Sequence, residues 1–148
     1  MKKLIVLGLV LFTGCSSTSH KMIVCNRTTN KMGVAMDLSY YIQYEDDNVT
    51  EIQSVERIRS NDQEKLDYFK TNFEDLYKNY VGLDYYKYDL SSENNTLTST
   101  VSIVYNDDNT ATLLKVAQSG KSFSKIGKVN VDSLLSYYKS VGISCEKK

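Results

Sequence analysis

The stretch Val34 to Arg59 reads VAMDLSYYIQYEDDNVTEIQSVERIR, and its first half alternates between apolar and mostly polar residues. The apolar positions are Val34, Met36, Leu38, Tyr40, Ile42 and Tyr44. A period of two places them all on one face of a β-strand. Glu45 to Asn48 is typical of a turn, because Asp and Asn tolerate tight backbone conformations. The stretch therefore predicts a long β-hairpin with one buried face.

The returning strand of this hairpin, Val49 to Arg59, keeps the period less strictly. Ile52 and Ile58 are in phase with each other, whereas Val55 is out of phase. A β-bulge or a half-exposed edge would account for the change.

The period changes after this hairpin. Apolar residues recur at steps of three and four, at Leu66, Phe69, Phe73, Leu76, Tyr77 and Tyr80. Ser60 to Asp62, with Gln63 and Glu64 placed for a capping box, predicts the start of a helix, and Gly82 predicts its end. We expect an amphipathic helix of about 19 residues that packs on the tyrosine-rich sheet.

Shorter patterns complete the chain. Met22 to Arg27 is β-like and precedes a predicted turn at residues 28–31, and a second hairpin covers residues 86–105 around a turn at 91–95. A short helix is predicted at 112–117, a loop at 118–128, and a last helix begins at Asn130 or Asp132 and ends at Gly142. The order predicts an α+β fold: an antiparallel sheet of two hairpins, with the amphipathic central helix and the C-terminal helix packed on one face.

The N-terminus has the form of a secretory signal. A positive start, Met1 to Lys3, precedes the apolar run Leu4 to Phe12, and Thr13-Gly14 stands directly before Cys15. The run is too short to span a bilayer, which takes about 20 helical residues. The pattern resembles a bacterial lipobox, in which the cysteine is acylated and becomes the first residue of the mature chain. The alternative is an ordinary signal peptide with Cys15 nearby by chance.

We therefore expect a lipoprotein signal peptide at 1–14, a lipid-anchored tether at 15–21 and a single domain at 22–148. The predicted location is the extracytoplasmic face of the cell membrane, with membrane lipid as a partner through acylated Cys15. With Cys15 acylated, the remaining cysteines, Cys25 and Cys145, are even in number, and export permits a disulfide between them. Two separate free thiols are the alternative.

Composition and motifs predict no catalytic residue, metal site or cofactor. The single histidine, His20, lies in the tether, where no rigid element holds it. The acidic runs at 45–48 and 106–109 lack the ligand spacing of an EF-hand and are typical of turns. The 18 basic and 18 acidic residues balance, so net charge does not indicate nucleic acid as a partner.

Tyrosine pairs are the best candidates for a binding surface. Neighbours in a strand point to opposite faces, so Tyr40-Tyr41 and Tyr85-Tyr86 each place one ring inward and one outward. Outward Tyr41 and Tyr85 would form a platform for an envelope protein, a peptide or a glycan. The alternative is that tyrosine is here simply a favoured strand residue.

Several segments together resemble the YehR-like family of small bacterial lipoproteins. They are the lipobox, the first strand with its cysteine, YEDDNVTEIQSVERI at 44–58, KNYVGLDY at 78–85, LTSTVSIVY at 97–105, and GISCEKK at 142–148. The resemblance covers roughly residues 25–148 and implies a compact α+β lipoprotein, without implying an activity. We expect a membrane-tethered, non-catalytic binding or interaction module. A surface hydrolase that uses carboxylates, and a secreted signal derived from the signal peptide, are the alternatives.

Overall fold

The computed structural model describes residues 21–106, 124–125 and 128–148. Its strands are β1 (Lys21–Lys31), β2 (Val34–Glu45), β3 (Asn48–Arg59), β4 (Tyr86–Glu93), β5 (Thr96–Val104), β6 (Ser124–Lys125), β7 (Lys128–Val129) and β8 (Ser144–Lys147). Its helices are α1 (Gln63–Tyr77) and α3 (Val131–Ser140). The predicted signal peptide, Cys15, His20 and the helix predicted at 112–117 lie outside the described residues.

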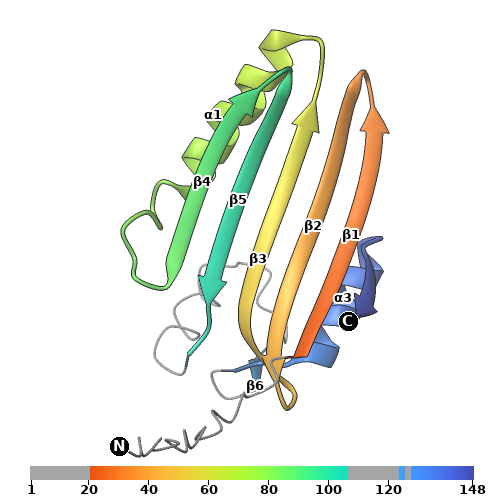
Figure 1. The fold of residues 1–148 in the computed structure, drawn as a ribbon, viewed down its shortest axis with the longest axis vertical. Coiled ribbons are helices and arrows are strands. Elements are labelled where there is room, and N and C mark those ends of the chain that lie inside the picture. The colour runs from red at the N-terminus through yellow and green to blue at the C-terminus, as the bar shows by residue number, and fades with distance from the viewer. Residues whose placement is uncertain (1–20, 107–123, 126–127) are drawn as a thin grey trace, which may run out of the picture.

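Six strands form one antiparallel sheet in the order β4-β5-β3-β2-β1-β8, and α1 and α3 lie behind it in Figure 1. The α+β prediction is confirmed, with β1 and β8 extending the sheet beyond the two predicted hairpins. A separate pairing of β6 with β7 lies where the sequence predicted only a loop.

Both helices cover the same face of the sheet. Leu66 and Phe73 of α1 pack with Val34, Ile58 and Leu97. Buried side chains of α3 pack at the other end of the sheet with a second set, which includes Ile23, Cys25, Ile42, Tyr44, Val49 and Ile52. We call the covered side the inner face and the opposite side the open face.

The first turn of the sheet differs from the prediction. β1 continues to Lys31, and the turn lies at Met32 and Gly33, whose φ angles are 55° and 77°. Positive φ at both central residues is the pattern of a two-residue hairpin whose twist matches its strands. The predicted turn at residues 28–31 is wrong, because that polar segment pairs in register with β2.

β3 contains a β-bulge, but not beside Val55, which pairs in unbroken register with Ser39 and Thr100. Gln43 pairs with Glu51 and Tyr44 pairs with Val49, so Thr50 is the extra residue. The bulge shifts the phase of the strand, which lets both Val49 and Ile52 enter the core.

Helix α1 begins at its predicted cap but is shorter than predicted. The Asp62 side chain accepts hydrogen bonds from the backbone N–H groups of Glu64 and Lys65. Lys65, at the third helical position, cannot return the capping-box hydrogen bond through a carboxylate or amide oxygen. Leu76 is 58% exposed, so its predicted place in the apolar stripe is wrong. It lies about a quarter turn from the line of Leu66 and Phe73, which face the core.

Candidate binding site: an apolar groove beside the first hairpin

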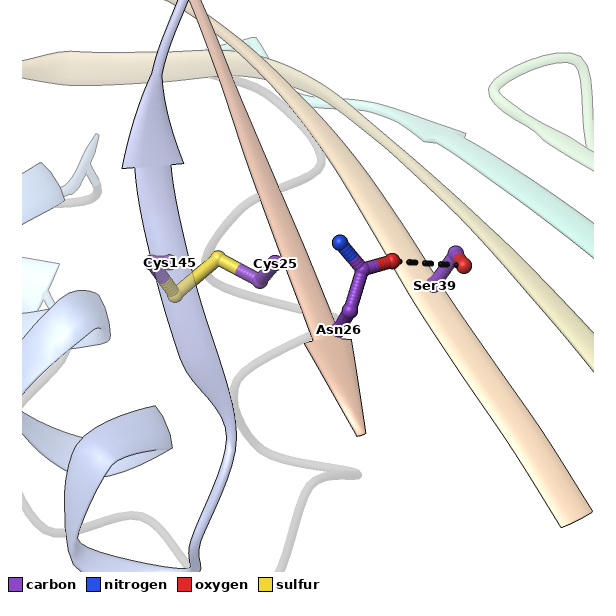
Figure 2. Close-up of a disulfide and its surroundings, with 4 residues drawn as sticks. All are labelled: Cys25, Asn26, Ser39 and Cys145. Atoms are coloured by element: carbon purple, nitrogen blue, oxygen red, sulfur yellow. Dashed lines mark hydrogen bonds between the residues drawn. A yellow bond between two sulfur atoms is a disulfide. The ribbon is translucent and has the colours of Figure 1, made fainter. Parts of the chain in front are cut away.

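Cys25 and Cys145 form a disulfide between directly opposed positions of β1 and β8 (Figure 2). Cys25 is fully buried, and the bond joins residues 120 positions apart. Asn26, the next residue of β1, lies on the open face, where its side-chain oxygen accepts a hydrogen bond from Ser39 at 2.8 Å (Figure 2). The predicted link between the first strand and the last segment is therefore present, and neither cysteine is a free nucleophile.

The paired tyrosines divide between the two faces. Tyr40 stacks on Tyr138 of α3 with 4.7 Å between ring centroids, and Tyr86 is buried. Tyr41 is partly exposed on the open face of β2, and Tyr85 is partly exposed just before β4. Since β3 and β5 separate β2 from β4, Tyr41 and Tyr85 lie at least about 14 Å apart, at roughly 4.8 Å per strand. The structure does not bring them together into one platform.

A groove of about 500 Å³ lies instead on the inner face, between the tip of the β1–β2 hairpin and the first turns of α1. Its apolar lining is Met32, Val34, Met36, Tyr68 and Phe69, and its charged rim is Lys31, Asp62, Glu64 and Lys65. Met32 and Tyr68 are 80% and 66% exposed. Neighbouring large exposed apolar side chains are typical of an interaction site.

The groove follows from the way α1 packs. Leu66 and Phe73 direct the helix toward β3 and β5, so its flank with Tyr68 and Phe69 faces the hairpin tip across a gap. The Nζ atom of Lys65 donates a hydrogen bond to the carbonyl oxygen of Met32 at 2.9 Å and joins the two walls. Sequence reasoning missed this site, because Met32 lay beyond the predicted strand and Phe69 read as core.

A half-buried carboxylate lies between the two core clusters. Glu56 of β3 is on the inner face, between Leu38 of β2 and Ser99 of β5. Burial raises the pKa of Glu56. Burial, followed by the negative charge of Glu56, raises the pKa of Tyr77 to about 12. Burial therefore disfavours the charged form of both groups on this part of the inner face.

We expect Glu56→Gln to stabilise the fold at pH 7. A carboxyl whose folded pKa lies above its unfolded pKa makes its full contribution to stability below the unfolded value, and that contribution is lost as the pH rises through the folded pKa. The variant should therefore match the wild type near pH 4 and exceed its melting temperature at pH 7. Thermal unfolding across this range measures the effect, with exposed Glu93→Gln as control. If the melting temperatures of the wild type and Glu56→Gln changed in parallel with pH, the prediction would be contradicted.

Metal and membrane-spanning features were sought within the described ranges. These residues contain no group of three or more His, Cys, Asp or Glu side chains placed to hold a metal ion. No helix in the described part of the chain is long and apolar enough to cross a membrane.

Two solved structures share this architecture. One is the NMR structure of the YehR protein of E. coli, with 17% identity, a TM-score of 0.54, and coverage of 86% of this chain and 92% of that chain. The chain has a YehR-like fold. The other is the NMR structure of a protein from Streptococcus pneumoniae TIGR4, with 12% identity, a TM-score of 0.54, and coverage of 99% and 96%.

At these identities, the likeness to YehR establishes the fold and carries no residue-level role. Neither of the two structures is described as an enzyme. No protein-family model and no curated protein sequence matches the chain. A function must therefore be argued from the geometry of the chain itself.

Proposed function

We propose that the protein is a lipid-anchored, non-catalytic binding module of the cell envelope, and that its ligand site is the apolar groove. The position of the groove carries this proposal. β1 starts at Lys21, where the predicted tether ends, and its 11 residues run to Lys31 on the groove rim. At about 3.3 Å per residue, the groove lies roughly 35 Å from the tether. An anchored domain would thus be able to hold its apolar site away from the membrane surface.

The lining indicates the kind of ligand. Met32 and Met36 are flexible and polarisable, and they adapt to apolar groups of different shape. Tyr68 and Phe69 add aromatic surface with little side-chain entropy to lose. The charged residues lie on the rim, where they would orient a ligand without being desolvated. The groove therefore suits an apolar group carried on a polar chain.

The disulfide supports an envelope location. A buried bond between Cys25 and Cys145 persists in an oxidising compartment, which an exported protein reaches. The lipobox pattern before Cys15 supplies the anchor, since two acyl chains on one residue provide stable membrane attachment.

We expect Cys15→Ser to release the protein from the membrane fraction. Loss of the thiol removes the only predicted acylation site, so both incorporation of radiolabelled fatty acid and sedimentation with membranes should fall by tenfold or more. Fractionation of bacterial cells that express the chain measures both. Cys145→Ser, which keeps the lipobox, should remain labelled. Unchanged sedimentation of the Cys15→Ser variant would refute the anchor.

A further inference from the structure

The strand that borders the groove is only partly paired on its outer side. β8 pairs with Ile23 to Asn26 of β1, and Figure 1 shows it beside that part of the strand. Among the residues that the structure describes, none pairs with the outer edge of β1 from Arg27 to Lys31. This free edge leads directly to the groove rim, which Lys31 and Met32 help to form.

Backbone groups at this edge are oriented for a further strand. The carbonyl oxygen of Met22 accepts a hydrogen bond from the N–H of Lys148, which follows β8, at 2.9 Å. The even-numbered residues of β1 therefore direct their N–H and C=O groups toward the β8 side. β1 pairs with β2 without irregularity, so the alternation holds through Thr28 and Asn30. Each of these two residues presents one donor and one acceptor outward.

Side chains on the inner face add selectivity at the free edge. Arg27, Thr29 and Lys31 lie on this face and pair with Leu38, Met36 and Val34 of β2. Thr29 is small, so a long apolar side chain from an added strand can pass over it toward Met36 in the groove. Lys31 is basic and borders the groove, whereas the Arg27 guanidinium donates to the carbonyl oxygen of Val141 at 3.2 Å.

We propose that an extended peptide binds as an added strand along Thr28 to Lys31, in line with β8, whose pairing with β1 ends at Asn26 and Ser144. The peptide carries an apolar side chain opposite Thr29, which fills the groove, and an acidic side chain two positions before it, which faces Lys31. Backbone hydrogen bonds to Thr28 and Asn30 supply affinity, and the alternating side chains supply specificity. This assignment rests on the proposed groove function and names its ligand class.

Fluorescence anisotropy tests the assignment, with the full chain purified in detergent. The probe is a labelled peptide, Thr-Glu-Thr-Leu-Thr, whose Glu and Leu would face Lys31 and Thr29 in a strand antiparallel to β1. We expect Asn30→Pro to weaken binding at least tenfold, because proline removes an outward N–H. The matched control is Ser92→Pro in edge strand β4. The carbonyl oxygen of Tyr85 accepts a hydrogen bond from the N–H of Val104, so odd-numbered residues of this strand bond to β5. The N–H of Ser92 therefore points outward, as that of Asn30 does. That variant should bind within twofold of the wild type.

Two further measurements keep the result independent of folding. A peptide with N-methyl groups on the two threonines that flank leucine loses the same hydrogen bonds, and it should bind the wild type at least tenfold more weakly. Lys31→Glu should weaken binding several-fold and should favour the peptide with lysine in place of glutamate. Met32→Glu tests the groove, with Met22→Glu at the other end of β1 as control.

The outcomes separate the two proposals. Equal binding of the N-methylated and unmodified peptides overturns strand addition, as does failure of the wild type to bind the probe. If Met32→Glu abolishes binding while Asn30→Pro and N-methylation do not, the groove remains the ligand site and the added strand is wrong. If neither Met32→Glu nor Asn30→Pro affects binding of the probe, both the groove and the strand are wrong.

Discussion

Reduction of the Cys25–Cys145 disulfide is expected to lower the free energy of unfolding by about 4 kcal/mol. The bond joins residues 120 positions apart, and the chain-entropy model gives nearly 5 kcal/mol for a loop of roughly this length, with measured losses of about 2–5 kcal/mol. The loss should be concentrated at β8, because within the described part of the chain this four-residue strand pairs only with β1. Urea unfolding with and without a reductant that does not absorb at the detection wavelength measures the difference.

The Cys25→Ala/Cys145→Ala double variant provides the control. It should unfold at a lower urea concentration than the oxidised wild type, and the reductant should not shift its midpoint. Hydrogen exchange should show loss of protection in β8 and at Ile23 to Asn26 of β1 before the rest of the sheet. A wild-type midpoint that does not change on complete reduction, verified by thiol alkylation, would show that the bond does not stabilise the fold.

Replacing Phe73 by alanine is expected to destabilise the protein by about 3–5 kcal/mol, the usual cost of truncating a buried Phe. Phe73 is 7% exposed, and its ring lies nearly parallel to that of Tyr77, with 6.3 Å between centroids. Its cluster holds α1 on the sheet through Ile58 and Leu97. The variant therefore leaves a cavity between α1 and the sheet.

Leu76→Ala is the matched control for Phe73→Ala. Both residues lie in the last turns of α1, both lose a large apolar side chain, and alanine favours the helix in both cases. Because Leu76 is 58% exposed, its truncation should change stability by less than about 0.5 kcal/mol. Chemical unfolding of the two variants measures the difference. Equal losses in the free energy of unfolding would mean that α1 does not turn Phe73 toward the sheet and Leu76 away from it.

Local patterns were sufficient for the central elements. The alternation from Val34 to Tyr44 predicts β2, because a period of two has no other regular interpretation over so many residues. The steps of three and four after Asp62 predict α1, and Asp62 caps it. The bulge was not located in this way, because it lies at Thr50, whereas the change of phase in the sequence falls between Ile52 and Val55.

Other features depended on long-range contacts. Residues 28–31 are polar and turn-like, yet they form a strand because β2 offers a partner in register. Leu76 fits a helical stripe, yet it is exposed because α1 packs on the sheet through Leu66, Phe73 and the partly buried Phe69 and Tyr77. The groove could not be predicted from the sequence, because its lining comes from the β1–β2 hairpin and from α1. Met32 and Lys65, which join its two walls, are more than 30 positions apart.

The sequence by itself determined the period of the main elements and the helix cap, because these depend on neighbours within a few residues, and the parity of the cysteines, because that is a count. Only the tertiary structure decided that Cys25 faces Cys145, that β8 covers part of β1 and leaves Arg27 to Lys31 free, and that α1 stands beside the hairpin tip. Those features depend on which elements pair and on where each helix finds apolar surface to bury. Contacts between elements that lie far apart in the sequence form only in the assembled chain, so no local pattern encodes them.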